Sequence, residues 1–481
     1  MRYIFILLSF FWCFGLLAQE LSPPTFSLPS GFYSEDVSLE ITHLDTDVLI
    51  LYTTDGSEPI YENIQGEVWF YKTEYPTSAN ADFYELYEDS ISTKIYNSSL
   101  ILQDRTPVET VLASVSTTLI YPDTGLNGVH RKAHIIRARA YSEIDDKYSD
   151  IVSANYFIFP EATSAYSFPV LALSFDNPYL YDYYEGISVP GVDYEDWMTE
   201  NPTETVDGFT PANYQRRGSG TEKEVHFNYF VNGEEVLNQN AGLRINGGYT
   251  RSYPNKSLRI YAKKAYGKKE LNYAFFKDYD LNKFQRLVLR NSGNDANYTL
   301  FRDAFVHKLS KNLNFDTQES QAIVLFLNGE YNGIRNIRER YDKKYFGAVH
   351  QVPEDELDFL ENYGEVKEGD ATRYNEMIRF FETHDLETEE DYQEALKFIE
   401  PSNFIDYYLT YIYAANDDWP GNNNLFWRRK VEPGAIEEAH YNDGRFRWIL
   451  KDMDHAFALK NKYENSHHAN TLAWATTKSN S

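Results

Sequence analysis

Two segments near the C-terminal end of the sequence combine the residue types that phosphoryl transfer needs. In the first, Asp418 and Asn423 have the spacing D-x-x-x-x-N and follow an apolar stretch that begins at Ser402 and predicts a helix through residue 415. A carboxylate just past such a helix can accept the proton of a nucleophile, and a nearby amide oxygen can hold a metal ion. The spacing is common by chance, and an Asp/Asn/Gly turn that caps its own backbone is the alternative interpretation.

In the second segment, FRWILKDMDHAF, Asp452 and Asp454 stand at the end of an apolar strand. Two acids two residues apart lie on the same face if the strand continues. Hard carboxylate oxygens of this kind suit Mg²⁺ or Mn²⁺. The segment therefore predicts a metal site, although a plain strand-end turn fits it equally well.

Residues 244–269 form a basic segment that has eight Lys and Arg side chains and no Asp or Glu. In a chain whose formal net charge is −28, such a segment indicates a local anion site. We take Lys256, Arg259 and Arg251 as candidates for binding phosphate, with Lys256 first. Because a strand alternates its faces, only some of them can reach one site, and a solvated strand face is the alternative for most of the lysines.

The elements that must position these residues follow one another in an informative order. After the basic strands we expect a helix over 299–313, a hairpin turning at Asn328-Gly329, helices near 370–383 and 388–399, the helix before Asp418 and a hairpin ending in Asp452. The first of these helices is predicted from Phe301, Phe305 and Leu309, which share one helical face. The order matches that of a protein kinase. The usual Gly-rich motif and the H-R-D and D-F-G triplets are missing, which excludes a typical kinase.

From about residue 168 to 460 the chain resembles the spore coat protein H (CotH) kinase-like family. The resemblance rests on five long motifs in the same order: LRINGGYTRSYPNKSLRIYAKKAYG, LVLRNSGNDANYTLFRDAF, FLNGEYNGIRNIRERYDKKYF, NDDWPGNNNLFWR and WILKDMDHAF. It implies an atypical, exported protein kinase that uses ATP and Mg²⁺ or Mn²⁺. It further implies that Asp418 is the catalytic acid/base, that Asn423, Asp452 and Asp454 form the metal site, and that Lys256 reaches the nucleotide phosphates.

The same resemblance assigns supporting roles to Arg290, Asn291, Asp295, Arg302 and Asp303. Glu339 is expected where the segment that joins the two lobes begins. Members of the family continue with further helices beyond WILKDMD, whereas this sequence stops at Ser481 in a polar tail. A truncated C-lobe is therefore one interpretation of the chain.

Residues 22–158 predict an all-β unit, because short alternating runs are separated by Pro, Gly, Asp and Asn. The clearest turn is Asp55-Gly56 in YTTDGSEP, a strong signal for tight reversal. This stretch resembles the β-sandwich domain at the C-terminus of chitobiases and β-hexosaminidases, with a long insertion around residues 60–100. The resemblance implies an immunoglobulin-like sandwich. Its aromatic residues either bind polysaccharide or belong to the core of a structural spacer.

The N-terminal residues read as a secretory signal peptide, residues 1–18, in which Arg2 precedes a long apolar run. The alternative is an N-terminal membrane anchor. No later segment is apolar for long enough to span a bilayer, so we expect an exported protein in the periplasm, at the cell surface or outside the cell. The excess of 73 acidic over 45 basic residues disfavours nucleic-acid binding, and the single Cys13 excludes a disulfide scaffold or a cysteine-ligated metal.

The resulting division is a signal peptide over 1–18, a chitobiase-type β-sandwich over 19–158, a linker over 159–167 and an α+β atypical kinase-like domain over 168–481. Three functions remain open. The leading one is a metal- and ATP-dependent kinase that phosphorylates Ser or Thr of exported proteins. The second is an extracellular carbohydrate-binding or adhesion protein with an inactive kinase-like domain. The third is a polysaccharide hydrolase, for which Asp418 and Asp452 would need the short separation of a retaining carboxylate pair.

Overall fold

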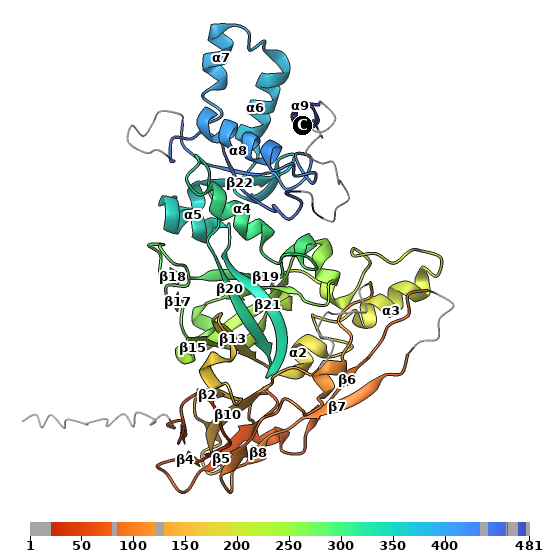
Figure 1. Ribbon diagram of the computed structural model, residues 1–481, viewed down its shortest axis with the longest axis vertical. Helices are drawn as coiled ribbons and strands as arrows, with labels where there is room; N and C mark the ends of the chain where they lie inside the picture. Colours follow the sequence, from red (N-terminus) through yellow and green to blue (C-terminus); the bar gives the residue numbers. More distant parts are fainter. Residues whose placement is uncertain are drawn as a thin grey trace, which may run out of the picture.

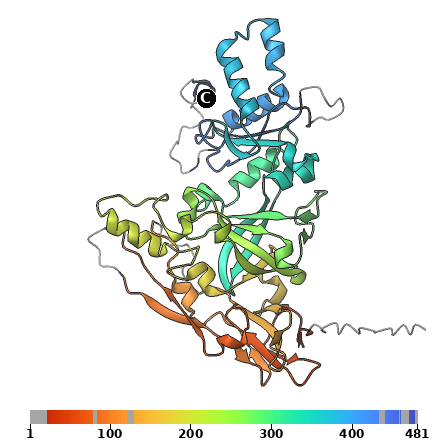
Figure 2. The ribbon, with the colours of Figure 1, turned by 180° about the vertical axis from the view of Figure 1, so that it is seen from behind.

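A computed structural model describes residues 21–78, 84–120, 129–432, 441–457, 459 and 470–477. The predicted signal peptide lies outside these residues. The described chain is rich in β structure and forms three tiers along its longest axis (Figure 1). The N-terminal sheets lie at one end, a closed barrel lies in the middle, and a small sheet with several helices lies at the other end (Figure 2). No helix in the described parts of the chain is long and apolar enough to cross a membrane.

The N-terminal tier is built around one six-stranded sheet. Its order is β2 (Gly31–Tyr33), β12 (Val152–Ile158), β10 (Ala133–Ser142), β5 (Leu49–Thr53) and β8 (Lys94–Ile95), with β11 (Lys147–Tyr148) paired to β10. Three two-stranded sheets accompany it: β1 (Thr25–Phe26) with β4 (Ile41–Thr42), β3 (Val37–Leu39) with β9 (Leu100–Leu102), and β6 (Glu67–Tyr71) with β7 (Tyr87–Ile91). The expected turn at Asp55-Gly56 is present, since β5 ends at Thr53 and Gly56 has φ +91°. Apart from the short helices η1 (Tyr61–Asn63) and α1 (Val111–Ser114), the regular structure of the described residues in this tier is β-strand, so the all-β prediction is confirmed for them.

Part of the predicted insertion around residues 60–100 packs against the barrel. It contains β6, whose Trp69 is 1% exposed and packs in the same apolar cluster as the barrel strands. Lys72, just after β6, pairs with Glu195 of helix α3 (Gly191–Glu200) at 2.5 Å. The insertion thus joins the N-terminal tier to the barrel, close to helix α2 (Asn177–Tyr181).

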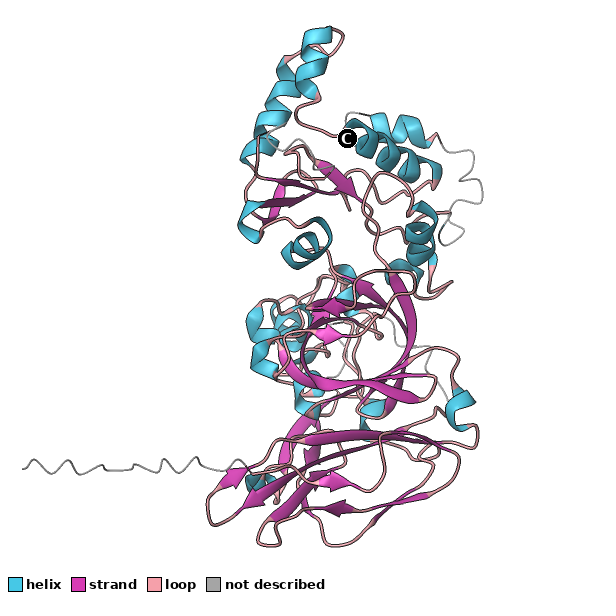
Figure 3. Cartoon of the chain, turned by 90° about the vertical axis from the view of Figure 1, so that its left-hand side faces the viewer, coloured by secondary structure: helices cyan, strands magenta, loops and turns pink. Residues whose placement is uncertain are grey.

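Seven strands close the barrel, which Figure 3 shows in the middle of the molecule. Their order is β13 (Val170–Ser174), β14 (Lys223–Val231), β15 (Glu234–Asn246), β16 (Ser257–Tyr261), β19 (Arg286–Arg290), β21 (Glu330–Glu339) and β20 (Ser320–Leu327). Every neighbouring pair is antiparallel except β13 and β20, whose parallel pairing closes the ring. The hairpin β14–β15 turns at Asn232-Gly233, and β20–β21 turns at Asn328-Gly329, with positive φ at both residues of each turn. The hairpin predicted at Asn328-Gly329 is confirmed, and Asn232-Gly233 is a turn dipeptide of the same kind. The short pair β17 (Leu271–Asn272) and β18 (Lys283–Phe284) lies outside this ring.

Helix α4 (Arg302–Ser310) confirms the helix predicted over 299–313, although it is shorter at both ends. Its apolar face is not the buried one. Phe305 and Leu309 are 46% and 60% exposed, whereas Asp303 and His307 are buried. The helix therefore turns the side that carries Asp303 toward the interior, where Asp303 pairs with Arg290 and Arg338.

The C-terminal tier holds a four-stranded antiparallel sheet in the order β23 (Glu365–Glu368), β22 (Leu357–Glu361), β24 (Leu425–Arg429) and β25 (Arg447–Ile449). It is accompanied by helices α5 (Lys343–His350), α6 (Thr372–Thr383), α7 (Glu389–Ala395), α8 (Pro401–Tyr413) and α9 (Thr471–Thr476). Helix α8 is the predicted one, but it begins at Pro401, one residue before the predicted start. Its N-cap is Glu400, whose carboxylate accepts a hydrogen bond from the Asn403 amide.

Candidate functional site

Arg290 is the centre of a charged cluster where the barrel meets the C-terminal tier. It is the last residue of β19, and its Nη2 donates to Asp452 Oδ1 at 2.9 Å and to Asp454 Oδ2 at 2.7 Å. Its Nε lies 3.6 Å from Asp303 Oδ2 on helix α4. Burial alone would lower the pKa of Arg290, but the three carboxylates raise it well above its usual value. One guanidinium thus gathers acids from three separate elements.

Asp303 connects helix α4 to the barrel and to the loop after β25. Arg338 of β21 donates to its Oδ2, and the backbone amide of Met453 donates to its Oδ1 at 2.8 Å. Burial tends to raise the pKa of Asp303, but Arg338 and Arg290 outweigh it and hold that pKa well below its usual range. The carboxylate is therefore an ionised anchor that fixes the backbone between Asp452 and Asp454.

Asp454 is the acid whose surroundings most favour a cation. Its side chain is 1% exposed, and its Oδ2 accepts from Arg290 and from the Asn294 amide at 3.0 Å. Its Oδ1 is buried and has no hydrogen-bond partner among the described residues. Burial raises the pKa of Asp454 well above its usual range, although Arg290 opposes this, and the charges of Asp452 and Asp303 raise it further. The three carboxylates of Asp303, Asp452 and Asp454 carry more negative charge than Arg290 and Arg338 neutralise, which suits a bound metal ion.

Gly293 makes room for Asp454. A Cβ at this position would lie 2.0 Å from Asp454 Oδ2, and the backbone has φ +50°. Both facts require glycine here. Sequence reasoning missed this role of Gly293, although the glycine belongs to the LRNSGND motif that contains Arg290.

The loop after helix α8 carries Asp418 and lies against the Asp452 loop. Asn416 donates its side-chain amide to the Asp452 carbonyl oxygen at 3.0 Å and accepts from the Asp418 amide at 3.0 Å. Burial raises the pKa of Asp418, and among the weaker causes the negative charge of Asp452 raises it further. The structure therefore brings Asp418 and Asp452 into one site, as the order of motifs predicts.

The amide of Asn423 faces Asp418 directly. Its Nδ2 donates to Asp418 Oδ2 at 2.8 Å, and the Asn422 amide lies 3.3 Å from Asp418 Oδ1. Asn423 has φ +56°, which Asn tolerates better than most residues. The two amides orient the carboxylate, and the Asn423 oxygen is left for another ligand.

The metal fit rests on one amide and two carboxylates. Asn423, Asp452 and Asp454 supply hard oxygens, and the unpartnered Oδ1 of Asp454 is a ready ligand atom. Within the described residues no group of three or more His, Cys, Asp or Glu side chains could hold a metal ion. Arg290 occupies an oxygen of each carboxylate, so a metal would share them with the guanidinium or displace it.

The other predicted supporting residues shape the loops around this site. Asn291 accepts from the Ser257 hydroxyl at 2.7 Å and donates to the Asn255 carbonyl at 2.6 Å. Asp295 accepts from the Arg302 amide at 3.1 Å, and Arg302 Nη1 donates to the Ala456 carbonyl at 2.7 Å. Arg302 therefore holds the chain just beyond Asp454.

The three basic candidates have other partners. Lys256 is 4% exposed, and its Nζ donates to the carbonyl oxygens of Thr117, Arg251 and Tyr253 at 2.7, 2.7 and 2.9 Å. Burial, followed by the charge of Arg251, holds the pKa of Lys256 well below its usual value. All three of its protons are thus directed at backbone oxygens of the two tiers it joins.

Arg251 and Arg259 are similarly engaged. Arg251 donates to the carbonyl oxygens of Tyr214, Ile245 and Arg216 at 2.6 to 2.7 Å. Arg259 Nε donates to Asn246 Oδ1 at 2.6 Å. Among the described contacts none joins these two side chains or Lys256 to the acidic cluster.

Glu339 lies at the end of β21 beside helix α5, as the start of a connecting segment would. It is 3% exposed, accepts from the Tyr279 hydroxyl at 2.5 Å, and accepts from the Glu319 amide at 3.1 Å. Burial is the largest cause that raises the pKa of Glu339 to about 7. Among the described residues, no hydrogen bond or ion pair joins Glu339 to Asp418.

A family model matches the part of the chain that carries this site. Residues 243–480 match the family model described as CotH kinase protein. The CotH-like region contains Arg290, Asp303, Asp418 and the Asp452 loop. It begins within β15, so β13 and β14 precede it although they belong to the same closed barrel. No curated protein matches the chain.

The match supports the predicted CotH resemblance. It does not reach the N-terminal tier, where the chitobiase-type sandwich stays a prediction. Sequence reasoning also missed two residues of the site, Arg338 and Asn416. The only available signal for Asn416 was its place directly after the predicted helix.

Proposed function

We propose that the protein is an exported, metal-dependent atypical protein kinase that transfers the γ-phosphate of ATP to Ser or Thr of exported proteins. The observation that carries this proposal is the pairing of Asp418 with the Asn423 amide beside the Asp452–Asp454 loop, whose buried Asp454 oxygen has no partner. The CotH-like region supports the same activity class. The division into signal peptide, sandwich, linker and kinase-like domain belongs to this proposal.

In this scheme Asp418 accepts the proton of the acceptor hydroxyl as the new O–P bond forms and the bond to ADP breaks. Because its pKa is raised, the Asp418 carboxylate is a stronger base toward the hydroxyl proton that it must accept. Asn422 and Asn423 orient its oxygens, and Asn416 fixes the loop that carries it. Asn423, Asp452 and Asp454 would hold Mg²⁺ or Mn²⁺, which supplies charge neutralisation for the phosphates when bound.

The test is transfer from γ-labelled ATP with Mg²⁺ or Mn²⁺, to the protein itself and to a generic acidic protein. Asp418→Asn and Asp452→Asn should each abolish transfer, while the exposed Glu390→Gln on α7 serves as the matched control. Labelling that persists in Asp418→Asn would overturn the assignment of the base.

A carbohydrate-binding or adhesion protein with an inactive kinase-like domain is the second candidate. The observation that favours it is the set of bonds of Lys256 and Arg290. Lys256 donates to three backbone oxygens, so it has no proton left for a phosphate. Arg290 bridges Asp452 and Asp454, the two acids that a metal would need. Folded protein that transfers no phosphate with either metal, yet binds polysaccharide through the N-terminal tier, would select this candidate.

A further inference from the structure

The outer face of the barrel carries a cluster of cationic side chains. On β16, Leu258 and Ile260 are buried in the barrel core, so the alternate residues Arg259 and Tyr261 lie on the outer face. Arg259 is opposite Arg244 of β15 in the strand register. The two arginines are therefore direct neighbours on that face.

The ring of Tyr261 is the centre of this cluster. Four cationic side chains surround it, with their charged groups 4.9 to 5.9 Å from the ring centroid: Arg244, Lys263, Arg286 and Arg340. Arg340 Nη1 also donates to the Tyr261 hydroxyl at 3.2 Å. Because the face of an aromatic ring attracts cations, Tyr261 holds these side chains together.

Two carboxylates pair with these four cations. Glu222 pairs with Arg244 at 2.6 Å and also with Lys263. Asp342 pairs with the other two at 2.8 and 3.4 Å. Arg259 adds a fifth cation to the cluster. In a chain whose formal net charge is −28, this local excess of positive charge indicates a site for an anion.

Arg259 is the cation of this cluster that pairs with no carboxylate among the described residues. Its side chain is half-buried, and its Nε donates to Asn246 Oδ1 at 2.6 Å. Burial is the largest cause that lowers the pKa of Arg259, and the charge of Arg340 lowers it further. A half-buried guanidinium that faces other cations is stabilised by a bound oxyanion, to which it can present two parallel N–H groups.

Arg259 also lies close to the arginine that holds the acidic site. Val288 of β19 is opposite Arg259, and Arg290 lies two residues further along the same face. Such diagonal neighbours are about 7–8 Å apart. Arg290 in turn donates to Asp452 and Asp454. A chain of phosphates that begins at the Asp452–Asp454 loop would therefore extend toward Arg259.

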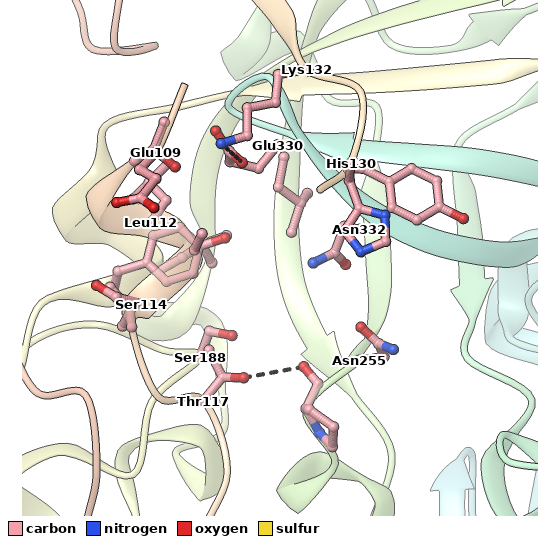
Figure 4. Close-up of a pocket in the computed structure, with 18 of the residues that line it drawn as sticks. Glu109, Leu112, Ser114, Thr117, His130, Lys132, Ser188, Asn255, Glu330 and Asn332 are labelled. Carbon is pink, nitrogen blue, oxygen red and sulfur yellow. Dashed lines mark hydrogen bonds and ion pairs between the residues drawn. The ribbon is translucent and has the colours of Figure 1, made fainter. Parts of the chain in front are cut away.

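Lys256, the first candidate for a phosphate ligand, has a different place. It lines a cavity of about 590 Å³ between the N-terminal tier and the barrel, and its Nζ donates to the Thr117 carbonyl oxygen of that tier. In the same region the Thr117 hydroxyl donates to the Pro254 carbonyl oxygen at 3.2 Å (Figure 4). Lys256 thus belongs to the contact between the two tiers.

We propose that Arg259, with Arg244 and Arg340 beside it, binds the phosphate oxygens of the nucleotide in place of Lys256. The identity of this ligand rests on the proposed phosphotransfer function. The anion site itself rests on the cluster, so inorganic triphosphate, which has no base or sugar, should bind there as well.

The test is calorimetry of the full-length protein with ATP and with inorganic triphosphate, next to the phosphoryl-transfer assay. Both ligands should bind saturably. Arg259→Gln should weaken both about 10- to 100-fold, because it removes charge-assisted hydrogen bonds to phosphate. Arg259→Lys keeps the charge but loses the paired N–H groups, so it should bind both with intermediate affinity. It also keeps the test decisive if Arg259→Gln does not fold.

Arg379→Gln is the matched control, because Arg379 is exposed on α6 in the C-terminal tier. It should leave both affinities unchanged. Wild-type affinity for ATP in both Arg259 variants would overturn this proposal without touching phosphoryl transfer. Absence of saturable binding of both ligands by the wild-type protein would overturn it too. Triphosphate binding that is lost in Arg259→Gln, in a protein that transfers no phosphate, would support the anion site and reject the proposed kinase activity.

Discussion

Asn416 donates its side-chain amide to the backbone carbonyl oxygen of Asp452 at 3.0 Å. This hydrogen bond ties the loop after helix α8 to the loop after β25, two loops separated by 36 residues in the sequence. The same side chain accepts from the Asp418 amide. The position of the proposed base relative to the proposed metal ligands therefore depends on a residue that needs to touch neither substrate.

Asn416→Ala should lower kcat by about 100-fold with little change in the KM for ATP, because a misplacement of about 1 Å in a catalytic group costs rates of that order. Steady-state phosphoryl transfer measures both constants. Asn375→Ala, on the exposed face of α6, is the control. An unchanged kcat in Asn416→Ala would show that the loops keep their relation without this bond.

Gly293→Ala tests the tight packing of Asp454. The added Cβ would lie 2.0 Å from Asp454 Oδ2 in a backbone with φ +50°, so we expect a loss of stability of about 2 kcal/mol or more. Thermal unfolding followed by tryptophan fluorescence measures the loss. Gly220→Ala is the matched control, since nothing lies within 4 Å of its Cβ position, and it should melt like the wild type. Equal melting of the two variants would contradict the packing.

Lys256→Met separates two roles for a buried lysine. Three backbone carbonyl oxygens would lose their donor, and an unpaired buried polar group costs about 1–3 kcal/mol, so a clear fall in melting temperature is expected. ATP affinity, measured by calorimetry on the remaining folded protein, should stay near the wild-type value. Lys268→Met, on the exposed part of the same basic segment, is the control. Weaker ATP binding at unchanged stability would instead support the phosphate role inferred from the sequence.

Local signals in the sequence predicted local structure well. The Asn-Gly dipeptides at 232–233 and 328–329 need positive φ at both residues, and the structure has it. The period of Phe301, Phe305 and Leu309 predicted a helix but carried no information on which face is buried. The buried face of α4 is the one that carries Asp303, which contacts Arg338 and Arg290. These contacts require the pairing of strands that are distant in the sequence, so the period of the helix could not predict them.

Pairings between segments that are distant in the sequence could not be predicted, because local patterns carry no information about them. The parallel pairing of β13 with β20 closes the barrel across about 150 residues, and no short motif encodes it. The basic segment predicted an anion site from its charge composition, which does not reveal the partner of each side chain. In the structure Lys256 donates to carbonyl oxygens of Thr117 and of its own turn. Asp418 and Asn423 were proposed because they follow a helix that the sequence marks clearly, and Asp452 and Asp454 because they follow an apolar strand. Their roles stay predictions.

Glu339 gives a pH-dependent prediction with a defined sign. Its pKa of about 7 in the folded state lies above the ordinary value of 4.5, so the folded protein keeps the proton longer than the unfolded chain does. Its contribution to stability is therefore fully present below about pH 4.5 and is lost as the pH rises toward 7, a change of about 3 kcal/mol. Glu339→Gln cannot ionise and should lack this dependence. Melting temperatures between pH 4.5 and 8 should show wild type falling relative to Glu339→Gln, while Glu390→Gln, an exposed control, follows the wild type. A constant difference between wild type and Glu339→Gln across that range would mean that Glu339 is ionised in the folded protein throughout.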